Sequence, residues 1–337
     1  MRLAAGLLAA ILLIASASSC SRPAPATRRA AIFSSQVVLT LRDHAEDSAF
    51  EACFERLRAI DAEMNMWDPA SELSRLNARA GTGSVPASRD LVIAAARGLE
   101  LARISGGIFD PSVGALVKLW GIGGPSPRVP SEAEIRAARA LVDWRRVRVD
   151  EKALTIELAR GMELDFGALA KGYGAEEGAR LLAERGVESA VLDVGGCVVV
   201  LGSGPGGAPW RIGVQNPGTA RGTPLGYFSL RDSAVDTSGL YERYFESGGR
   251  RYAHIFDTRT GRPLEGGLVS ASIALGREEN SDGPSLILLV LGPSEGLAFA
   301  DRMGWAVVLL GEDKKLYLSK AAKPLFTLID SSYSLAK

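Results

Sequence analysis

The feature of this sequence that most restricts its fold is the separation of helical and strand-like hydrophobic patterns into different stretches of the chain. Helical spacing dominates the stretch 48–140, whereas 210–275 reads almost wholly as strand and turn. Between 145 and 196, short strand patterns surround one helical pattern. Such segregated blocks favour an α+β fold over a doubly wound sheet, in which helices and strands alternate regularly.

Helices are predicted from apolar spacing and from capping residues. Ser48 with Glu51, and Ser131 with Glu134, have the spacing of a capping box at a helix start. Gly106 is placed to end the second helix. The predicted helices are 48–64, one that follows Ser88 and ends at Gly106, one that begins at Ser131, about 171–184, and 293–304, the last preceded by an apolar stretch over 285–292.

Strands are predicted where short apolar or alternating runs are bounded by turn residues. They are 147–150, 154–158, 162–166, 189–194, 210–214, 227–230, 251–257, 270–275 and 306–310. The glycine-rich segment GSGPGG (202–207) superficially resembles a dinucleotide-binding fingerprint. Because that fingerprint needs a following helix and 210–214 reads as a strand, GSGPGG is interpreted as a hairpin turn.

The first twenty residues are predicted to be an export signal. Arg2 precedes an apolar run, 3–14, that is shorter than the ~18 to 20 residues of a spanning helix. Small residues then precede Cys20, as in a bacterial lipobox. Either 1–19 is a lipoprotein signal peptide and Cys20 is lipidated, or an ordinary secretory signal is cut nearby. We expect 20–31 to be a lipid-anchored Pro/Ala tether and 32–337 to be one folded domain.

Composition excludes several classes of protein. The 39 Lys and Arg residues balance 39 Asp and Glu, which removes any global electrostatic case for a nucleic-acid partner. A hydrophobic fraction of 47% is that of a globular protein. Three Cys cannot make a disulfide scaffold, and the sequence leaves open whether Cys53 and Cys197 pair. No Cys/His cluster indicates zinc or haem.

The segment 164–178 is a candidate anion site. Asp165 ends a predicted strand, a glycine turns the chain, and Lys171 enters the next helix. Backbone N–H groups and the positive end of the helix dipole favour phosphate oxygens at such a place. The alternative is an ordinary ion pair between Asp165 and Lys171.

His254 and Asp282 also admit two interpretations each. Alternation in 251–257 places His254 on the same strand face as Tyr252 and Phe256, where a histidine is usually packed or solvated but can act as a base. Asp282 stands just ahead of an apolar helix, where it is either an N-cap or a hard oxygen ligand for Mg²⁺.

Seven segments, in order, resemble the FAD:protein FMN transferases, the ApbE-type flavin transferases. Together they run through about 32–310 of the chain. They are WDPASELSRLN (67–77), GGIFDPSVGALVKLWGIG (106–123), LDFGALAKGY (164–173), LDVGG (192–196), TSGLYERYF (237–245), HIFDTRTGRP (254–263) and SDGPSLILLVLG (281–292).

The resemblance implies a single large domain of mixed, mostly antiparallel sheets with flanking helices. It also implies a Mg²⁺-dependent enzyme that moves FMN from FAD to a Thr or Ser hydroxyl of an exported acceptor protein and releases AMP. Acceptors in the family are typically subunits of membrane redox complexes. Since members are commonly periplasmic lipoproteins, we expect this protein on the periplasmic side of a bacterial membrane, anchored through Cys20.

The resemblance assigns roles residue by residue. His254 would be the base toward the acceptor hydroxyl, and its ordinary pKa of about 6.5 suits that task. The carbonyl of Ala168 and the carboxylate of Asp282 would bind Mg²⁺. The residues that would contact the flavin dinucleotide are Trp67, Ile108, Phe109, Asp110, Asp165, Lys171, Ile255 and Phe256.

The sequence departs from the family pattern close to the expected chemistry. Leu286 stands where the family usually has a metal-binding Thr, so Ser285 or water would have to supply that oxygen. Cys197 follows the paired glycines in place of a polar residue, and Thr258 replaces the usual Pro after Asp257. Two other functions therefore stay open: an FAD pyrophosphatase of the same fold, and a non-catalytic FAD-binding lipoprotein.

Overall fold

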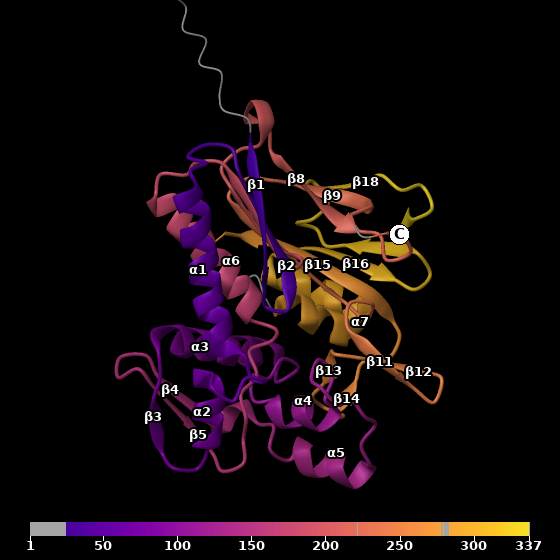
Figure 1. Ribbon diagram of the computed structural model, residues 1–337. Helices are drawn as coiled ribbons and strands as arrows, with labels where there is room; N and C mark the ends of the chain where they lie inside the picture. The colour runs from indigo at the N-terminus through magenta and orange to yellow at the C-terminus, as the bar shows by residue number, and fades with distance from the viewer. Residues whose placement is uncertain (1–24, 221, 278, 280–282, 337) are drawn as a thin grey trace, which may run out of the picture.

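A nine-stranded sheet forms the centre of the protein in the computed structural model, which describes residues 25–220, 222–277, 279 and 283–336 (Figure 1). Neighbouring strands are antiparallel throughout, except for the parallel pair β17 and β19. In spatial order the strands are β1 (Ala26–Ile32), β2 (Ser35–Leu41), β6 (Ala190–Val194), β7 (Cys197–Leu201), β10 (Ser233–Gly239), β15 (Leu268–Gly276), β16 (Ala306–Gly311), β17 (Lys315–Leu318) and β19 (Ser334–Leu335).

Both faces of this sheet are covered, which explains why β16 is apolar throughout. Val307 and Leu309 face α7 (Pro284–Met303), while α1 (Asp47–Met64) and α6 (Ala170–Glu184) pack against β1, β6 and β7 and contribute to the same hydrophobic core. Val308 and Leu310 face a second sheet built from β18 (Phe326–Leu328), β9 (Pro224–Leu230) and β8 (Trp210–Gln215). A strand buried on both sides loses the apolar–polar alternation of a half-exposed strand.

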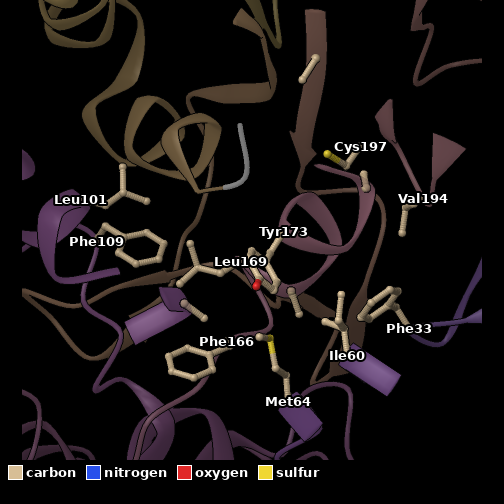
Figure 2. Packing of buried hydrophobic residues seen from close by; sticks show 14 of the residues in the cluster. Phe33, Ile60, Met64, Leu101, Phe109, Phe166, Leu169, Tyr173, Val194 and Cys197 are labelled. Atoms are coloured by element: carbon tan, nitrogen blue, oxygen red, sulfur yellow. The ribbon is translucent and has the colours of Figure 1, made fainter. Parts of the chain in front are cut away.

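A smaller helical part packs below the sheet and shares its core. It contains Phe166 and Leu169 just before α6, which point into the same interior as Ile60 and Met64 of α1 (Figure 2). Its elements are α2 (Glu72–Ala78), α3 (Arg89–Ser105), α4 (Gly114–Trp120), α5 (Glu132–Arg139), the 3-10 helix η1 (Trp144–Arg146) and a sheet of β3 (Ser84–Pro86), β5 (Thr155–Leu158) and β4 (Val147–Asp150).

Three short connections complete the fold. The β11 (Tyr244–Ser247) and β12 (Arg250–Ala253) strands form a hairpin, and β13 (Phe256–Asp257) pairs with β14 (Arg262–Pro263). The 3-10 turn η2 (Pro205–Gly207) joins β7 of the nine-stranded sheet to β8 of the three-stranded sheet. The α+β class and the mostly antiparallel architecture are therefore confirmed, but GSGPGG connects two sheets and is not a hairpin turn.

Two of the three capping predictions are confirmed. Ser88 caps α3 through the N–H of Leu91, and Gly106 ends it with φ of 65°. Ser131 makes a full capping box with Glu134 at α5. The predicted capping box of Ser48 with Glu51 is wrong, because α1 begins at Asp47 and Ser48 already lies within its first turn.

Three predicted segments differ from the structure. The tether prediction is wrong for 26–31, because β1 begins at Ala26 and pairs with β2 through Ile32, an edge strand built on main-chain bonds with mostly exposed side chains. The predicted strand 162–166 makes only a single bridge, between Val113 and Glu163, among the described residues. The predicted strand 251–257 is interrupted at 254–255, so it becomes β12 and β13.

The C-terminal helical prediction has the expected two parts. The apolar stretch and the helix that follows it form α7, which is broken by Gly292 at φ of 75° and by Pro293. Cys53 and Cys197 are both buried and are not joined by a disulfide, and burial raises the pKa of Cys53 to about 12. Within the described part of the chain, no helix combines the length and apolarity needed to cross a bilayer.

Candidate active site

A cavity of about 1240 Å³ lies where the central sheet meets the smaller helical part. Small-molecule pockets usually measure ~300 to 1000 Å³, so this one has room for a dinucleotide. The β10 strand pairs with β7 only through Ser233–Val235 among the described residues, and the following residues of β10 line the cavity. The hollow therefore opens where two neighbouring strands of the sheet separate.

Two tight turns shape the rim next to this opening. Gly195 and Gly196 form the two-residue turn between β6 and β7, with φ of 59° and 100°. A Cβ on Gly195 would lie 2.7 Å from the Cβ of Ser35, so this turn can approach the β1–β2 hairpin only as glycine. Phe33 in that hairpin also has positive φ, and its N–H donates to Asp61 at 2.8 Å.

The start of α6 brings Asp165, Ala168 and Lys171 to the cavity wall. The N–H of Gly167 donates to Asp165 Oδ1 at 2.8 Å, and burial raises the pKa of that carboxyl. No ion pair joins Asp165 to Lys171 within the described residues, so the simple pairing considered from the sequence is not observed. Lys171 is the second residue of α6, beside the positive end of the helix dipole, and this arrangement suits phosphate oxygens.

The segment before α4 contributes Ile108, Phe109 and Asp110 to the same wall. Asp110 is buried, and its carboxylate accepts hydrogen bonds from the N–H and hydroxyl of Ser112 and from the N–H of Trp144, at 2.9, 2.7 and 3.0 Å. Burial nevertheless raises its pKa. Asp110 therefore holds this segment in shape.

Trp67 is a large apolar side chain at the rim of the cavity, and 37% of its surface is accessible to solvent. Its ring lies against Gly124, where a Cβ would come within 2.5 Å. An exposed indole fixed beside a cavity is suited to stack on a planar ring. Ile255 and Phe256 line the interior as buried neighbours of His254.

His254 lies in the bend between β12 and β13 and faces the cavity. Its N–H and its ring Nδ1 both lie near the carbonyl oxygen of Arg243, at 3.1 and 3.0 Å. Since a carbonyl only accepts, Nδ1 carries the proton and Nε2 keeps a free lone pair. Burial lowers the pKa of His254 to about 4, and the charges of Arg243 and Lys171 act in the same direction. The imidazole is therefore neutral at pH 7 and can accept a proton.

The predicted metal ligands do not all lie in the cavity wall: Ala168 lines it, whereas Ser285 does not. The carbonyl oxygen of Ala168 lies 3.5 Å from the position that a Cβ on Gly283 would occupy, so this oxygen faces the start of α7. Asp282, the residue before Gly283, lies outside the described residues. Ser285 is fully buried, and its hydroxyl donates to Asp236 and lies 2.7 Å from the hydroxyl of Ser238. Leu286, in contrast, lines the cavity.

The sequence interpretation missed two residues of the cavity wall, Arg243 and Asp236. Arg243 fixes the imidazole through its carbonyl, and its guanidinium lies 3.4 Å from the carbonyl oxygens of Phe33 and Ser34. No side-chain pattern reveals a contact made by a main-chain oxygen. Asp236 is buried in the cavity wall. It directly precedes the TSG segment that resembles the family, and this adjacency is the one feature of the sequence that could have indicated it.

The cavity unites nearly all the predicted site residues that the structure describes. Ser285 does not line it, and Cys20 and Asp282 lie outside the described residues. Within the described chain, no group of three His, Cys, Asp or Glu side chains is arranged to hold a metal. The predicted residues that line the cavity are Trp67, Ile108, Phe109, Asp110, Asp165, Ala168, Lys171, His254, Ile255 and Phe256.

Comparison with known proteins matches residues 33–309 to the ApbE family. The FAD:protein FMN transferase of Treponema pallidum (strain Nichols) is 32% identical over 86% of this chain and 84% of its own length. That of Klebsiella pneumoniae (strain 342) is 32% identical over 91% of this chain and 95% of its own.

Solved structures agree in fold. The ApbE protein of Thermotoga maritima has a TM-score of 0.82 and 28% identity, covering 90% of this chain and 99% of the other. The apo form of the Pseudomonas stutzeri flavinyl transferase ApbE has a TM-score of 0.78 and 29% identity, covering 90% and 96%.

Proposed function

The chain belongs to the ApbE family, and from this membership we propose that it is an FAD:protein FMN transferase. The transfer moves FMN from FAD to a Thr or Ser hydroxyl of an exported acceptor protein and releases AMP. The observation that carries the proposal is a neutral imidazole held in the wall of a dinucleotide-sized cavity, with a cationic helix start beside it. A base and a phosphate site are the two elements that phosphoryl transfer to a hydroxyl requires.

In the proposed reaction, the acceptor hydroxyl oxygen attacks the phosphorus that carries the riboflavin. The new P–O bond joins FMN to the acceptor, and the P–O bond to the AMP phosphate breaks. His254 Nε2 takes the hydroxyl proton, while the carbonyl of Arg243 holds Nδ1–H and stabilises the imidazolium that forms. The cleaved pyrophosphate bond leaves AMP with the electron pair.

The chain's other residues position the substrate. Lys171 and the first turn of α6 bind phosphate oxygens, and Trp67 offers a face for a planar ring. Hard oxygen donors such as the Ala168 carbonyl and a carboxylate fit Mg²⁺, and the resemblance assigns that carboxylate to Asp282. When bound, Mg²⁺ would neutralise charge on the pyrophosphate.

Two alternative functions share this cavity. A pyrophosphatase would use water in place of the acceptor hydroxyl, and a binding protein would hold FAD without cleaving it. Leu286 at the cavity wall favours the binding protein, because a leucine cannot ligate a metal. The retained His254 favours catalysis, because simple binding does not require a base.

The deciding experiment mixes the full chain, FAD, Mg²⁺ and an acceptor domain. Transfer predicts a flavin-fluorescent acceptor band on a denaturing gel together with AMP. AMP and free FMN without that band would indicate hydrolysis, and retained FAD without AMP would indicate binding alone. His254→Ala should abolish the band while FAD binding persists, and unchanged turnover would remove His254 from its role.

A further inference from the structure

A second hollow, of about 580 Å³, lies beside the main cavity. Its walls come from α5, η1, the segment before α4 and the turn after β13. Asp110 and Thr258 line both hollows. The hydroxyl of Thr258 donates to the carbonyl of Gly107 at 2.7 Å, so the partition between the two is fixed. We call this second hollow the arginine pocket.

Five arginines line the arginine pocket in a protein whose net charge is zero. The carboxylates in its lining are Asp143 and the buried Asp110, whose oxygens already accept three hydrogen bonds. Positive charge is therefore locally in excess. The five are Arg136, Arg139, Arg145, Arg146 and Arg259.

Most of this positive charge is not neutralised within the described residues. Arg145 lies 3.5 Å from Asp143, and Arg259 binds Asp257 through two contacts of 2.9 Å. The other three arginines of the pocket make no ion pair with any described residue. The two glutamates of the first turn of α5 do not compensate, because they pair with arginines outside the pocket.

The pocket wall also contains a hydrogen-bond donor without a partner. Trp144 Nε1 is buried and has no acceptor among the described residues. Gly107 faces it, and a Cβ there would lie 3.3 Å from Nε1. Trp144 Nε1 is covered by its neighbours, so the guanidinium groups are what the hollow offers to a ligand. Guanidinium groups around one hollow are suited to carboxylate groups, which arginine binds through two parallel bonds.

We propose that the arginine pocket docks an acidic stretch of the acceptor polypeptide next to the hydroxyl that receives FMN. This rests on the proposed transferase function. Thr258, which lines both hollows, follows His254 by four residues, so a segment seated in the pocket borders the wall that carries the base. Exposed charges of this kind mainly raise the association rate and select the partner.

A protein partner fits better than a membrane surface. In Figure 1, β1 enters at the top of the molecule, whereas α5 lies at the bottom. A protein anchored through its N-terminus would thus hold the arginine pocket away from the lipid. The pocket is also a local depression, and a flat headgroup layer would not fill it.

The test uses the full chain and two labelled peptides, each with one Thr, flanked by Asp in one and by Asn in the other. We expect the Asp peptide to bind more tightly, with an affinity that falls between 50 and about 300 mM NaCl. Arg136→Gln with Arg139→Gln should weaken its binding roughly two- to thirtyfold, the range for losing two exposed charge pairs. Fluorescence anisotropy measures this binding independently of catalysis.

The matched control is Arg89→Gln with Arg185→Gln, which removes two exposed arginines far from the pocket in sequence and should leave peptide affinity unchanged. Equal binding of both peptides would overturn the proposal. So would loss of binding to phosphatidylglycerol vesicles, with peptide binding intact, in the Arg136/Arg139 variant. Failure of transfer with charge-dependent peptide binding retained would instead contradict the proposed function.

Discussion

At the scale of single residues, the surroundings of His254 determine when it can act. An exposed imidazole with a pKa near 6.5 is half protonated at that pH, and the protonated half cannot act as a base. Burial lowers the pKa of His254 to about 4, so its neutral form persists as the pH falls through 6.

We therefore predict that transfer keeps its base-dependent rate down to about pH 5. The acid limb of kcat/KM for the acceptor, measured from pH 4.5 to 8, should fall toward the lowered pKa because that ratio reports the free enzyme. A half-loss of rate at pH 6.5 would contradict this. The same shift makes folding more favourable above pH 6.5 and less favourable toward pH 4, since below 6.5 the unfolded imidazole binds a proton that the folded one does not. His254→Gln should remove that dependence.

Leu286 gives a second prediction at this scale. Its side chain lines the cavity, whereas the hydroxyl of Ser285 is engaged by Asp236 and Ser238. Leu286→Thr should raise Mg²⁺ affinity about tenfold, the scale at which changes around a metal site alter binding. Calorimetric titration of Mg²⁺ measures this without turnover. Leu286→Val, which has the shape of Thr but no oxygen, is the control, and an equal gain in both variants would exclude a ligand effect.

At the scale of elements, the cavity rim depends on two turns that fit closely. Gly195→Ala would place a Cβ 2.7 Å from that of Ser35. We expect a loss of about 1 to 3 kcal/mol in the free energy of unfolding, as for other overpacked sites, together with weaker FAD binding. Urea unfolding and FAD titration measure the two effects. Adding Ser35→Gly should recover part of the stability, and no recovery would assign the loss to the backbone alone.

How far the sequence predicts an element depends on which interactions build it. Ser131 and Ser88 cap their helices through local contacts that are visible in sequence. The β1 strand is held by main-chain pairing to β2, so its exposed side chains resemble a linker. The bend at His254 is fixed by the carbonyl of Arg243, a distant main-chain atom that no local pattern reveals.

The candidate site follows the same rule. Its residues were predicted through the family resemblance, and ten of them line one cavity. The contacts of Arg243 and the buried position of Asp236 arise only when β10, the loop after it and the β1–β2 hairpin meet. Those contacts depend on tertiary packing.

At the scale of the whole molecule, attachment to a membrane is a separate prediction. Cys20→Ser should release the protein from the membrane fraction while leaving its fold and FAD affinity unchanged, because the cavity lies within 34–286. Fractionation of cells and mass analysis of the N-terminal peptide measure this. Persistent membrane association of the variant, with an unmodified N-terminus in the parent, would favour an ordinary secretory signal and another mode of attachment.

The edge strand β1 sets how far an anchored protein could stand from its membrane. Because β1 begins at Ala26, only positions 20–25 would separate the sheet from a lipid on Cys20. Six residues reach at most about 20 Å when fully stretched. An enzyme tethered this closely would reach only acceptors that are held at the same membrane.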